Sequence, residues 1–185
     1  MHLYQCIKDS SVLKNITYIS NNSYLFTGRV RDNLLMGNEN ASDEDMWRVL
    51  QKVNLSEFLK NEKGLDTQLL DKASNLSGGQ CQRLALARAL LFDSPAIKFD
   101  EATSNIDVES EDKIMELVRD IAKTKTVILI SHRLANVVDT DNIYVIDNGN
   151  VVENGKHNDL VSKNGVYAKL WNAQQSLENY VKDGE

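Results

Sequence analysis

Short apolar runs rich in β-branched residues alternate along the chain with segments in which apolar residues recur every three or four positions. The short runs are NITYIS (15–20), PAIKFDE (95–101), TKTVILIS (124–131) and NIYVIDNGNVVENG (142–155), the last typical of two strands joined by an Asp147-Asn148-Gly149 turn. Helical spacing is found at 42–60, with Ser42 as N-cap, and at 76–91 and 107–123. Strands alternating with helices of this length predict an α/β fold with a mainly parallel sheet.

Polar residues stand where three of the predicted strands end. These residues are Asn21 and Asn22, Asp100 and Glu101, and Ser131 and His132. Ligands of open parallel sheets bind beyond the carboxyl ends of the strands, so the pattern favours a site at that edge. The simpler interpretation is that polar residues resume wherever a strand ends.

The stretch LSGGQ (76–80) places two glycines side by side at the start of a predicted helix. Each glycine costs about 1 kcal/mol relative to alanine inside a helix, so the pair needs a reason. Ser77 and Gln80 have the spacing of a capping box. Gly78 and Gly79 then expose backbone N–H groups at the positive end of the helix dipole, an arrangement suited to a phosphate. A well-capped helix alone explains Ser77 and Gln80 but not the glycines.

Composition narrows the classes of function. The chain has 185 residues, of which 42% are hydrophobic and 26% charged, as is ordinary for one soluble globular domain. A net charge of −6 argues against a nucleic-acid partner, and no apolar run is long enough for a membrane span. Cys6 and Cys81 follow no spacing pattern and are interpreted as free thiols.

Taken together, these motifs resemble the ATP-binding cassette (ABC) ATPases, whose signature sequence is LSGGQ. AIKFDEATSNID resembles their Walker B strand and D-loop, and ISHRL their switch histidine. ITYISNNSYLFTGRVRDNLLMG resembles the Q-loop and the segment after it, which contacts the transmembrane partner. The resemblance runs from about Ile16 onward, with the motifs in the expected order. The residues of these motifs are most similar to those of exporters whose ATPase follows a membrane domain in the same polypeptide.

The resemblance implies a P-loop NTPase-like α/β fold built on a mainly parallel sheet with a helical subdomain. Its parts would be a helical subdomain with the signature at about 29–90, a core from Walker B to the switch histidine at 91–165, and a C-terminal helix at 166–185. ATP and Mg²⁺ are the implied cofactors. The implied partners are a second ABC ATPase domain and the transmembrane domain of an exporter, which places the chain in the cytoplasm at the inner face of the cell membrane.

Each site residue takes its expected role from the resemblance. Asp100 would hold Mg²⁺ through water, Glu101 would be the general base, and His132 would position the phosphate and the attacking water. Asn21 stands where the Q-loop glutamine belongs, one methylene shorter, so its contact with the metal is in doubt. The residues expected to meet ATP held by the second ATPase domain are Ser77, Gly78, Gly79, Gln80 and the D-loop residue Asp107.

Several departures matter as much as the matches. The chain contains no G-x-x-x-x-G-K-[ST] phosphate loop, which in the family lies upstream of the Q-loop. We therefore expect an ATPase domain that is incomplete at the N-terminus, with open apolar sheet surface, poor Mg-ATP binding and little activity alone. Leu70, Asp71 and Ala73 replace the glycine, glutamate and glycine that precede the signature.

Lys98 interrupts the Walker B strand, which should be apolar, and lies two residues from Asp100 on the same side of the strand. Either Lys98 reaches toward the gap where the phosphate loop would be, or its strand lies at a sheet edge.

Three hypotheses about function remain at this point. The first is part of an exporter ATPase domain that, in the intact protein, couples ATP binding and hydrolysis to transport. The second is a non-catalytic partner chain that donates LSGGQ in trans. The third is an inactive gene remnant.

Overall fold

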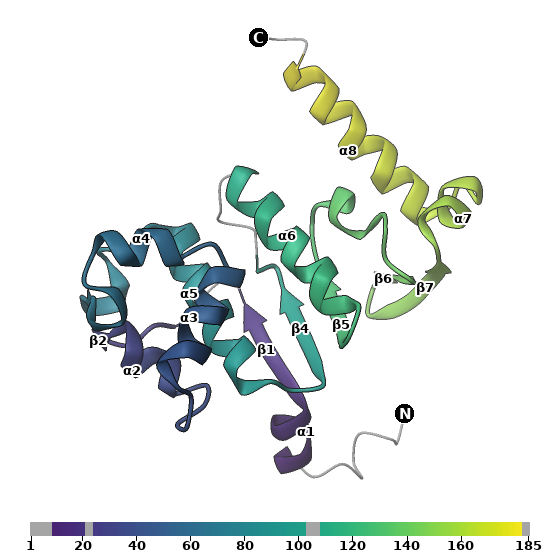
Figure 1. Ribbon diagram of the computed structural model, residues 1–185. Coiled ribbons are helices and arrows are strands. Elements are labelled where there is room, and N and C mark those ends of the chain that lie inside the picture. Colours follow the sequence, from purple (N-terminus) through teal and green to yellow (C-terminus); the bar gives the residue numbers. More distant parts are fainter. Residues whose placement is uncertain (1–8, 21–23, 103–107, 183–185) are drawn as a thin grey trace. The chain divides into compact units, whose positions relative to one another are not determined.

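The computed structural model describes residues 9–20, 24–102 and 108–182, which fall into two compact units, Met1–Ile130 and Ser131–Glu185 (Figure 1). The helices of the first unit are α1 (Asp9–Asn15), α2 (Val30–Leu35), α3 (Asp43–Lys52), α4 (Ser56–Asn61), α5 (Gly78–Phe92) and α6 (Val108–Ala122), with short 3-10 helices η2 (Gly64–Asp66) and η3 (Asp71–Ala73). Its strands are β1 (Ile16–Ser20), β2 (Gly28–Arg29), β3 (Gln68–Leu69), β4 (Ala96–Asp100) and β5 (Thr126–Ile130).

The central element of the first unit is a parallel sheet in the order β1-β4-β5. The register pairs Ser20 with Asp100 and Asp100 with Ile130, so the three carboxyl ends lie at one edge. This confirms the predicted α/β fold. Because β4 is flanked by β1 and β5, the interpretation of Lys98 as an edge-strand residue is wrong.

The two faces of this sheet differ in burial. Ile19, Ile97 and Phe99 are at most 2% exposed and belong to the same core as Leu86 of α5 and Ile114 of α6. On alternate positions, Ile16, Tyr18, Ile128 and Ile130 are 37%, 58%, 47% and 40% exposed. Successive strand residues point to opposite faces, so one face is packed and the other carries the exposed apolar surface that was expected.

Between β1 and β4 the chain forms a helical region, α2 to α5, with the antiparallel pair β2-β3. Ser42 caps α3: its Oγ accepts from the Asp45 amide, and Asp45 Oδ2 accepts from the Ser42 amide, both at 3.1 Å. The predicted N-cap is confirmed, but the continuous helical pattern of 42–60 is not one helix. It divides into α3 and α4 at Asn54, whose φ of 54° is left-handed.

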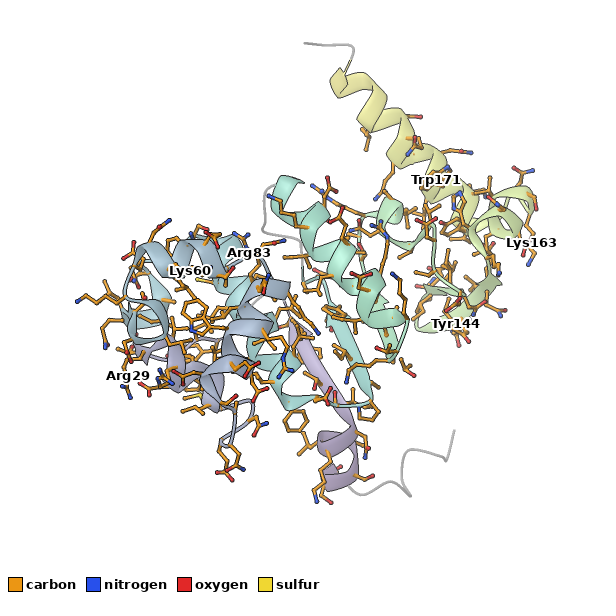
Figure 2. All side chains as sticks on the ribbon, viewed as in Figure 1. Arg29, Lys60, Arg83, Tyr144, Lys163 and Trp171 are labelled. Atoms are coloured by element: carbon orange, nitrogen blue, oxygen red, sulfur yellow. The ribbon has the colours of Figure 1, made fainter. Side chains whose placement is uncertain are left out.

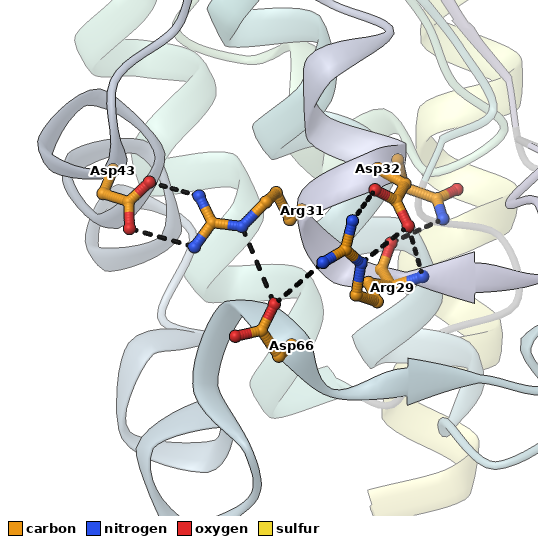
Figure 3. Close-up of polar contacts among 6 residues, drawn as sticks. Arg29, Arg31, Asp32, Asp43 and Asp66 are labelled. Atoms are coloured by element: carbon orange, nitrogen blue, oxygen red, sulfur yellow. Dashed lines mark hydrogen bonds and ion pairs between the residues drawn. The ribbon is translucent and has the colours of Figure 1, made fainter.

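Two arginines, Arg29 and Arg31, join three parts of this helical region (Figure 3). Arg29 pairs with Asp32 at 2.9 Å and Asp66 at 3.4 Å, while Arg31 pairs with Asp43 and, at 3.7 Å, with Asp66. The hydrogen bond from Arg29 lowers the pKa of Asp32, and that from Arg31 lowers the pKa of Asp43. Because these pairs lie at the surface, they add little to stability, and the acceptor that they share, Asp66, mainly fixes how the three parts are arranged.

The second unit contains η4 (Leu134–Val137), β6 (Ile143–Asp147), β7 (Asn150–Gly155), α7 (His157–Ser162) and α8 (Val166–Lys182). The strands β6 and β7 form an antiparallel hairpin whose turn uses positive φ at Asn148 (47°) and Gly149 (76°), as predicted.

The small core of this unit is built on Ile143, Val145, Leu160 and Tyr167, with Trp171 of α8 packed against it (Figure 2). Across the described ranges of both units, no helix is long and apolar enough to cross a bilayer.

Candidate functional site

The N-terminus of α5 has the geometry predicted for LSGGQ. Ser77 Oγ accepts from the Gln80 amide at 3.2 Å, and Gln80 Oε1 accepts from the Ser77 amide at 2.8 Å. This capping box leaves the N–H groups of Gly78 and Gly79 without an acceptor inside the helix. Gly78 is exposed, whereas Gly79 is buried.

The first turn of α5 also lacks acidic residues, whereas the first turn of α3 has Asp43, Glu44 and Asp45. In α3 the hydroxyl of Ser42 donates to Asp45 Oδ2 at 2.7 Å. In α5 a neutral amide, Gln80, occupies that third position, and within the described part of the chain no acceptor takes the Ser77 proton. Two helices of one chain thus use the same cap, but only α5 offers donors to an anion without a carboxylate beside them.

The loop before α5 is held by Asn75. Its side chain accepts from the Leu70 amide and donates to the Gln68 carbonyl, both at 2.9 Å. Lys72 and Ala73 both have a φ of 52°, in the left-handed region. Ala73 occupies a place where the resemblance expects glycine, so the backbone conformation that favours glycine is kept without the glycine.

A buried glutamine that the sequence pattern did not single out connects α5 with the sheet. Gln82 is 7% exposed, and its Nε2 donates to the carbonyl of Ser20 at the carboxyl end of β1, at 3.0 Å. At the next position of α5, the Arg83 guanidinium (Figure 2) donates to the carbonyl of Gly79, one turn earlier in the helix, at 3.2 Å. The signature helix is therefore tied to the edge of the sheet where the polar strand ends lie.

Asp100 ends β4 as predicted and is engaged by two neighbours. Its Oδ2 lies 3.2 Å from Lys98 Nζ and accepts from the Tyr18 hydroxyl at 3.0 Å. The hydrogen bond to Asp100 raises the pKa of Tyr18. The expectation that Lys98 lies on the same side as Asp100 is confirmed; its ammonium reaches the carboxylate of Asp100.

The fit of a divalent cation at this edge can be judged from Asp100. Mg²⁺ is usually held by one or two carboxylates together with substrate phosphates. Asp100 Oδ2 is already paired with an ammonium, and no group of three His, Cys, Asp or Glu side chains that could hold a metal forms among the described residues. The side chains as arranged therefore do not form a ready cation site.

Glu101 follows Asp100 in a left-handed backbone conformation, with φ of 51°. Its amide donates to the carbonyl of Ile130 at 3.0 Å, which fixes the residue at the carboxyl ends of β4 and β5. Such a φ is unusual for a residue other than glycine and occurs where neighbouring structure enforces it, often at functional sites.

The remaining predicted site residues are His132, Asn21 and Asp107. His132 belongs to the second unit, where it is exposed and its carbonyl accepts a hydrogen bond from the side chain of Gln174 on α8. Asn21 and Asp107 fall outside the described residues, so their roles stay predictions.

An apolar pocket of about 340 Å³ lies in the first unit beside α5. Its lining includes Tyr24, Phe26 and Phe92, which are 52%, 46% and 44% exposed. The fully buried Asn33 holds Phe26 in place by accepting from its amide and donating to its carbonyl, both at 2.8 Å. Arg88, whose pKa burial lowers, donates to the carbonyl of Tyr24 at 2.8 Å. The backbone of Phe26 is therefore held by the buried Asn33 and that of Tyr24 by the half-buried Arg88, and this pocket was not predicted from the sequence.

Comparison with known proteins shows which family has this sequence and fold. A family profile described as "ABC transporter" matches residues 3–104. An uncharacterized ABC transporter ATP-binding protein of Haemophilus influenzae is 46% identical over 172 residues, which cover 93% of this chain and 31% of that protein. An ATP-dependent lipid A-core flippase of Vibrio vulnificus is 42% identical over 168 residues, covering 88% of this chain and 29% of that protein.

Among solved structures, a bacterial Atm1-family ABC exporter with ATP bound matches with a TM-score of 0.85 and 32% identity, over 91% of this chain and 30% of that one. The chain thus spans about a third of the length of the relatives it matches. The matched profile, these identities and the P-loop NTPase-like α/β architecture agree, and the chain belongs to the ABC transporter family.

Proposed function

We propose that this chain is part of the ATP-binding domain of an exporter, and that the N-terminus of α5 binds the terminal phosphate of ATP held by a second ABC ATPase domain. The observation that carries the proposal is the capped N-terminus of α5, with Gly78 and Gly79 and no acidic residue in its first turn. The amides and the Ser77 hydroxyl are donors suited to a phosphate.

In the intact assembly, Glu101 is the proposed general base, because a carboxylate can accept a proton from water. Its backbone is fixed at the carboxyl ends of β4 and β5 by the bond to Ile130, at the edge where ligands of parallel sheets bind. A carboxylate there accepts the proton of the water that attacks the γ-phosphate. His132 and Asp107 would contact the nucleotide, in the roles the family resemblance gives them.

The pocket lined by Tyr24, Phe26 and Phe92 is the proposed contact with a transmembrane domain. These side chains belong to the segment after β1 and to the end of α5, so a partner seated there touches the helix that carries the signature. Exposed aromatics suit a protein interface, and the backbone of two of them, Tyr24 and Phe26, is fixed by polar side chains. This contact would place the chain at the cytoplasmic face of the cell membrane.

A second candidate function is that of a partner that donates the signature but does not hydrolyse ATP. The observation that favours it is the pairing of Lys98 with Asp100, the carboxylate expected at the magnesium site. In both candidates the signature meets ATP on another domain; they differ in whether this chain also turns ATP over. An inactive remnant predicts neither property.

Sedimentation of this chain with the ATP-binding domain of the Haemophilus influenzae relative, with a chelator present so that ATP persists, tests the proposal. We expect a heterodimer with ATP and separate species with ADP, because only ATP has a γ-phosphate for α5 to bind. Identical sedimentation with ATP and ADP would contradict the proposal. The two candidates are separated in an assembly that supplies a phosphate loop beside this chain: Glu101→Gln should lower ATP hydrolysis if this chain turns ATP over, and should leave hydrolysis unchanged if the chain only donates the signature.

A further inference from the structure

Lys98 lies in the middle of the exposed face of the β1-β4-β5 sheet. The register places Tyr18, Lys98 and Ile128 side by side across the three strands, and Asp100 follows Lys98 on the same face. Tyr18 and Ile128 are 58% and 47% exposed, and the side chains of Lys98 and Asp100 are 35% and 28% exposed. A lysine in a central strand is unusual because such strands are commonly apolar on both faces.

The side chain of Lys98 is held by two neighbours. Its Nζ is 3.2 Å from Asp100 Oδ2 and 5.0 Å from the centre of the Tyr18 ring. The Tyr18 hydroxyl donates to the same Oδ2 at 3.0 Å. One carboxylate oxygen of Asp100 therefore interacts with both the Lys98 ammonium and the Tyr18 hydroxyl. The Tyr18 ring also makes a cation–π contact with the ammonium.

We infer that Lys98 is a positioning residue that acts as an internal counter-cation for Asp100 and competes with a divalent cation for this carboxylate. The inference rests on the proposed function in taking Asp100 as the carboxylate of the cation site. Mg²⁺ attracts a carboxylate by its charge and dehydrates reluctantly. The ammonium of Lys98, already paired with Oδ2, neutralises part of the negative charge of Asp100, and Mg²⁺ has to displace it.

The competition is partial because the pair is not buried. Ion pairs that water reaches are worth up to about 1 kcal/mol, which corresponds to a factor of up to about five in affinity. Lys98 thus lowers the affinity of Asp100 for a divalent cation without abolishing binding, and bound phosphate or high cation concentration displaces it.

Terbium(III) is a suitable probe, since it is a hard cation that prefers oxygen ligands and its emission is sensitised by a nearby tyrosine. The Tyr18 hydroxyl contacts Asp100 directly, so terbium bound at Asp100 lies beside a sensitising phenol. Titrations of the full chain use the wild type, Lys98→Met, Lys98→Gln and Lys98→Arg. Mg²⁺ is then added as a competitor, and circular dichroism checks that each variant is folded.

We expect Lys98→Met and Lys98→Gln to bind terbium about two to five times more tightly than the wild type, because both remove the cation. Lys98→Arg keeps the charge and should bind like the wild type. The gain should vanish in Lys98→Met/Asp100→Asn. Two uncharged variants are included so that the test stands if one of them does not fold.

Equal affinity in the wild type and the folded uncharged variant would overturn the inference. So would an equal gain in Lys98→Arg, or a gain that persists without Asp100. These titrations contain neither nucleotide nor partner domain, so their outcome is separate from that of the ATP-dependent association that tests the proposed function.

Discussion

The side chain of Gln82 joins the signature helix to the sheet through a 3.0 Å hydrogen bond from its amide to the carbonyl of Ser20. Gln82 is 7% exposed, so water competes little for this bond. Replacement by methionine keeps the volume but removes the donor, and we expect a loss of about 1 kcal/mol in the free energy of unfolding. Urea denaturation measures it.

Gln51→Met on the exposed side of α3 is the matched control and should change the stability by no more than about 0.5 kcal/mol. Gln82→Glu should cost more than Gln82→Met, because it buries a carboxylate against a carbonyl oxygen. Equal stabilities of Gln82→Met and Gln51→Met would show that the bond does not stabilise the unit.

Lys72, in the loop before the signature, has an exposed side chain and a φ of 52°. A left-handed conformation costs a residue other than glycine roughly 1–2 kcal/mol, and glycine loses about 0.5–1 kcal/mol more backbone entropy on folding. Lys72→Gly should therefore raise the free energy of unfolding by about 0.5 kcal/mol. Lys52→Gly, in the last turn of α3, should instead lower it, by up to about 1 kcal/mol. The same sign for both substitutions would contradict the argument.

Gly37 permits close contact between the end of α2 and the backbone of α5. A Cβ at this position would lie 2.2 Å from the carbonyl oxygen of Arg88, which belongs to backbone and cannot rotate away. Gly37→Ala should destabilise the first unit by about 2–3 kcal/mol, as expected for overpacking. Gly149→Ala, with no atom within 4 Å but a φ of 76°, should cost only about 1 kcal/mol. A loss at Gly37 as small as that at Gly149 would contradict the close contact.

Glu153 caps the start of α8 in the second unit. Its carboxylate accepts from the amides of Val166 at 2.7 Å and Tyr167 at 3.0 Å, and these bonds lower its pKa. A lowered pKa stabilises the folded state above the ordinary glutamate value of about 4.3, and this stabilisation is lost as the pH falls through the lower folded value. Glu153→Gln should therefore speed amide exchange in α8 at pH 7. In acid, the exchange rates of the variant and the wild type should become more similar.

Glu57→Gln is the control for Glu153→Gln, because Glu57 pairs with Lys60 at the surface and does not cap α8. Gly165→Ala should act like Glu153→Gln, since a Cβ there would lie 1.8 Å from Glu153 Oε1. A difference between Glu153→Gln and wild type that is the same at neutral and acid pH would argue against the carboxylate cap.

The parts of the site that depend on local sequence could be predicted. Both N-caps, the Asp147-Asn148-Gly149 turn and the alignment of strand ends follow from interactions within a few residues or from the rules of parallel sheets. The prediction of a single helix at 42–60 is wrong at Asn54. The spacing of apolar residues continues across Asn54, but its left-handed backbone separates α3 from α4.

Contacts between distant residues could not be predicted. Gln82 reaches Ser20, 62 positions away, and nothing in the helical pattern marks this glutamine as buried. Lys98 was predicted beside Asp100 from strand periodicity, but the Tyr18 hydroxyl on the same oxygen depends on the register between β1 and β4. Asn33 and the aromatic pocket that it supports likewise depend on packing.

The central claim is that the N-terminus of α5 binds ATP held by a second ABC ATPase domain. The most direct test measures the association constant of this chain with such an ATP-loaded domain for two variants, each lacking one N-cap serine. Ser77→Ala and Ser42→Ala each remove an N-cap serine and should each cost about 1 kcal/mol of stability. We predict that Ser77→Ala weakens ATP-dependent association about tenfold or more, because a hydrogen bond to a charged phosphate is lost, whereas Ser42→Ala leaves it unchanged. Equal effects of the two substitutions, or association that does not depend on ATP, would contradict the account.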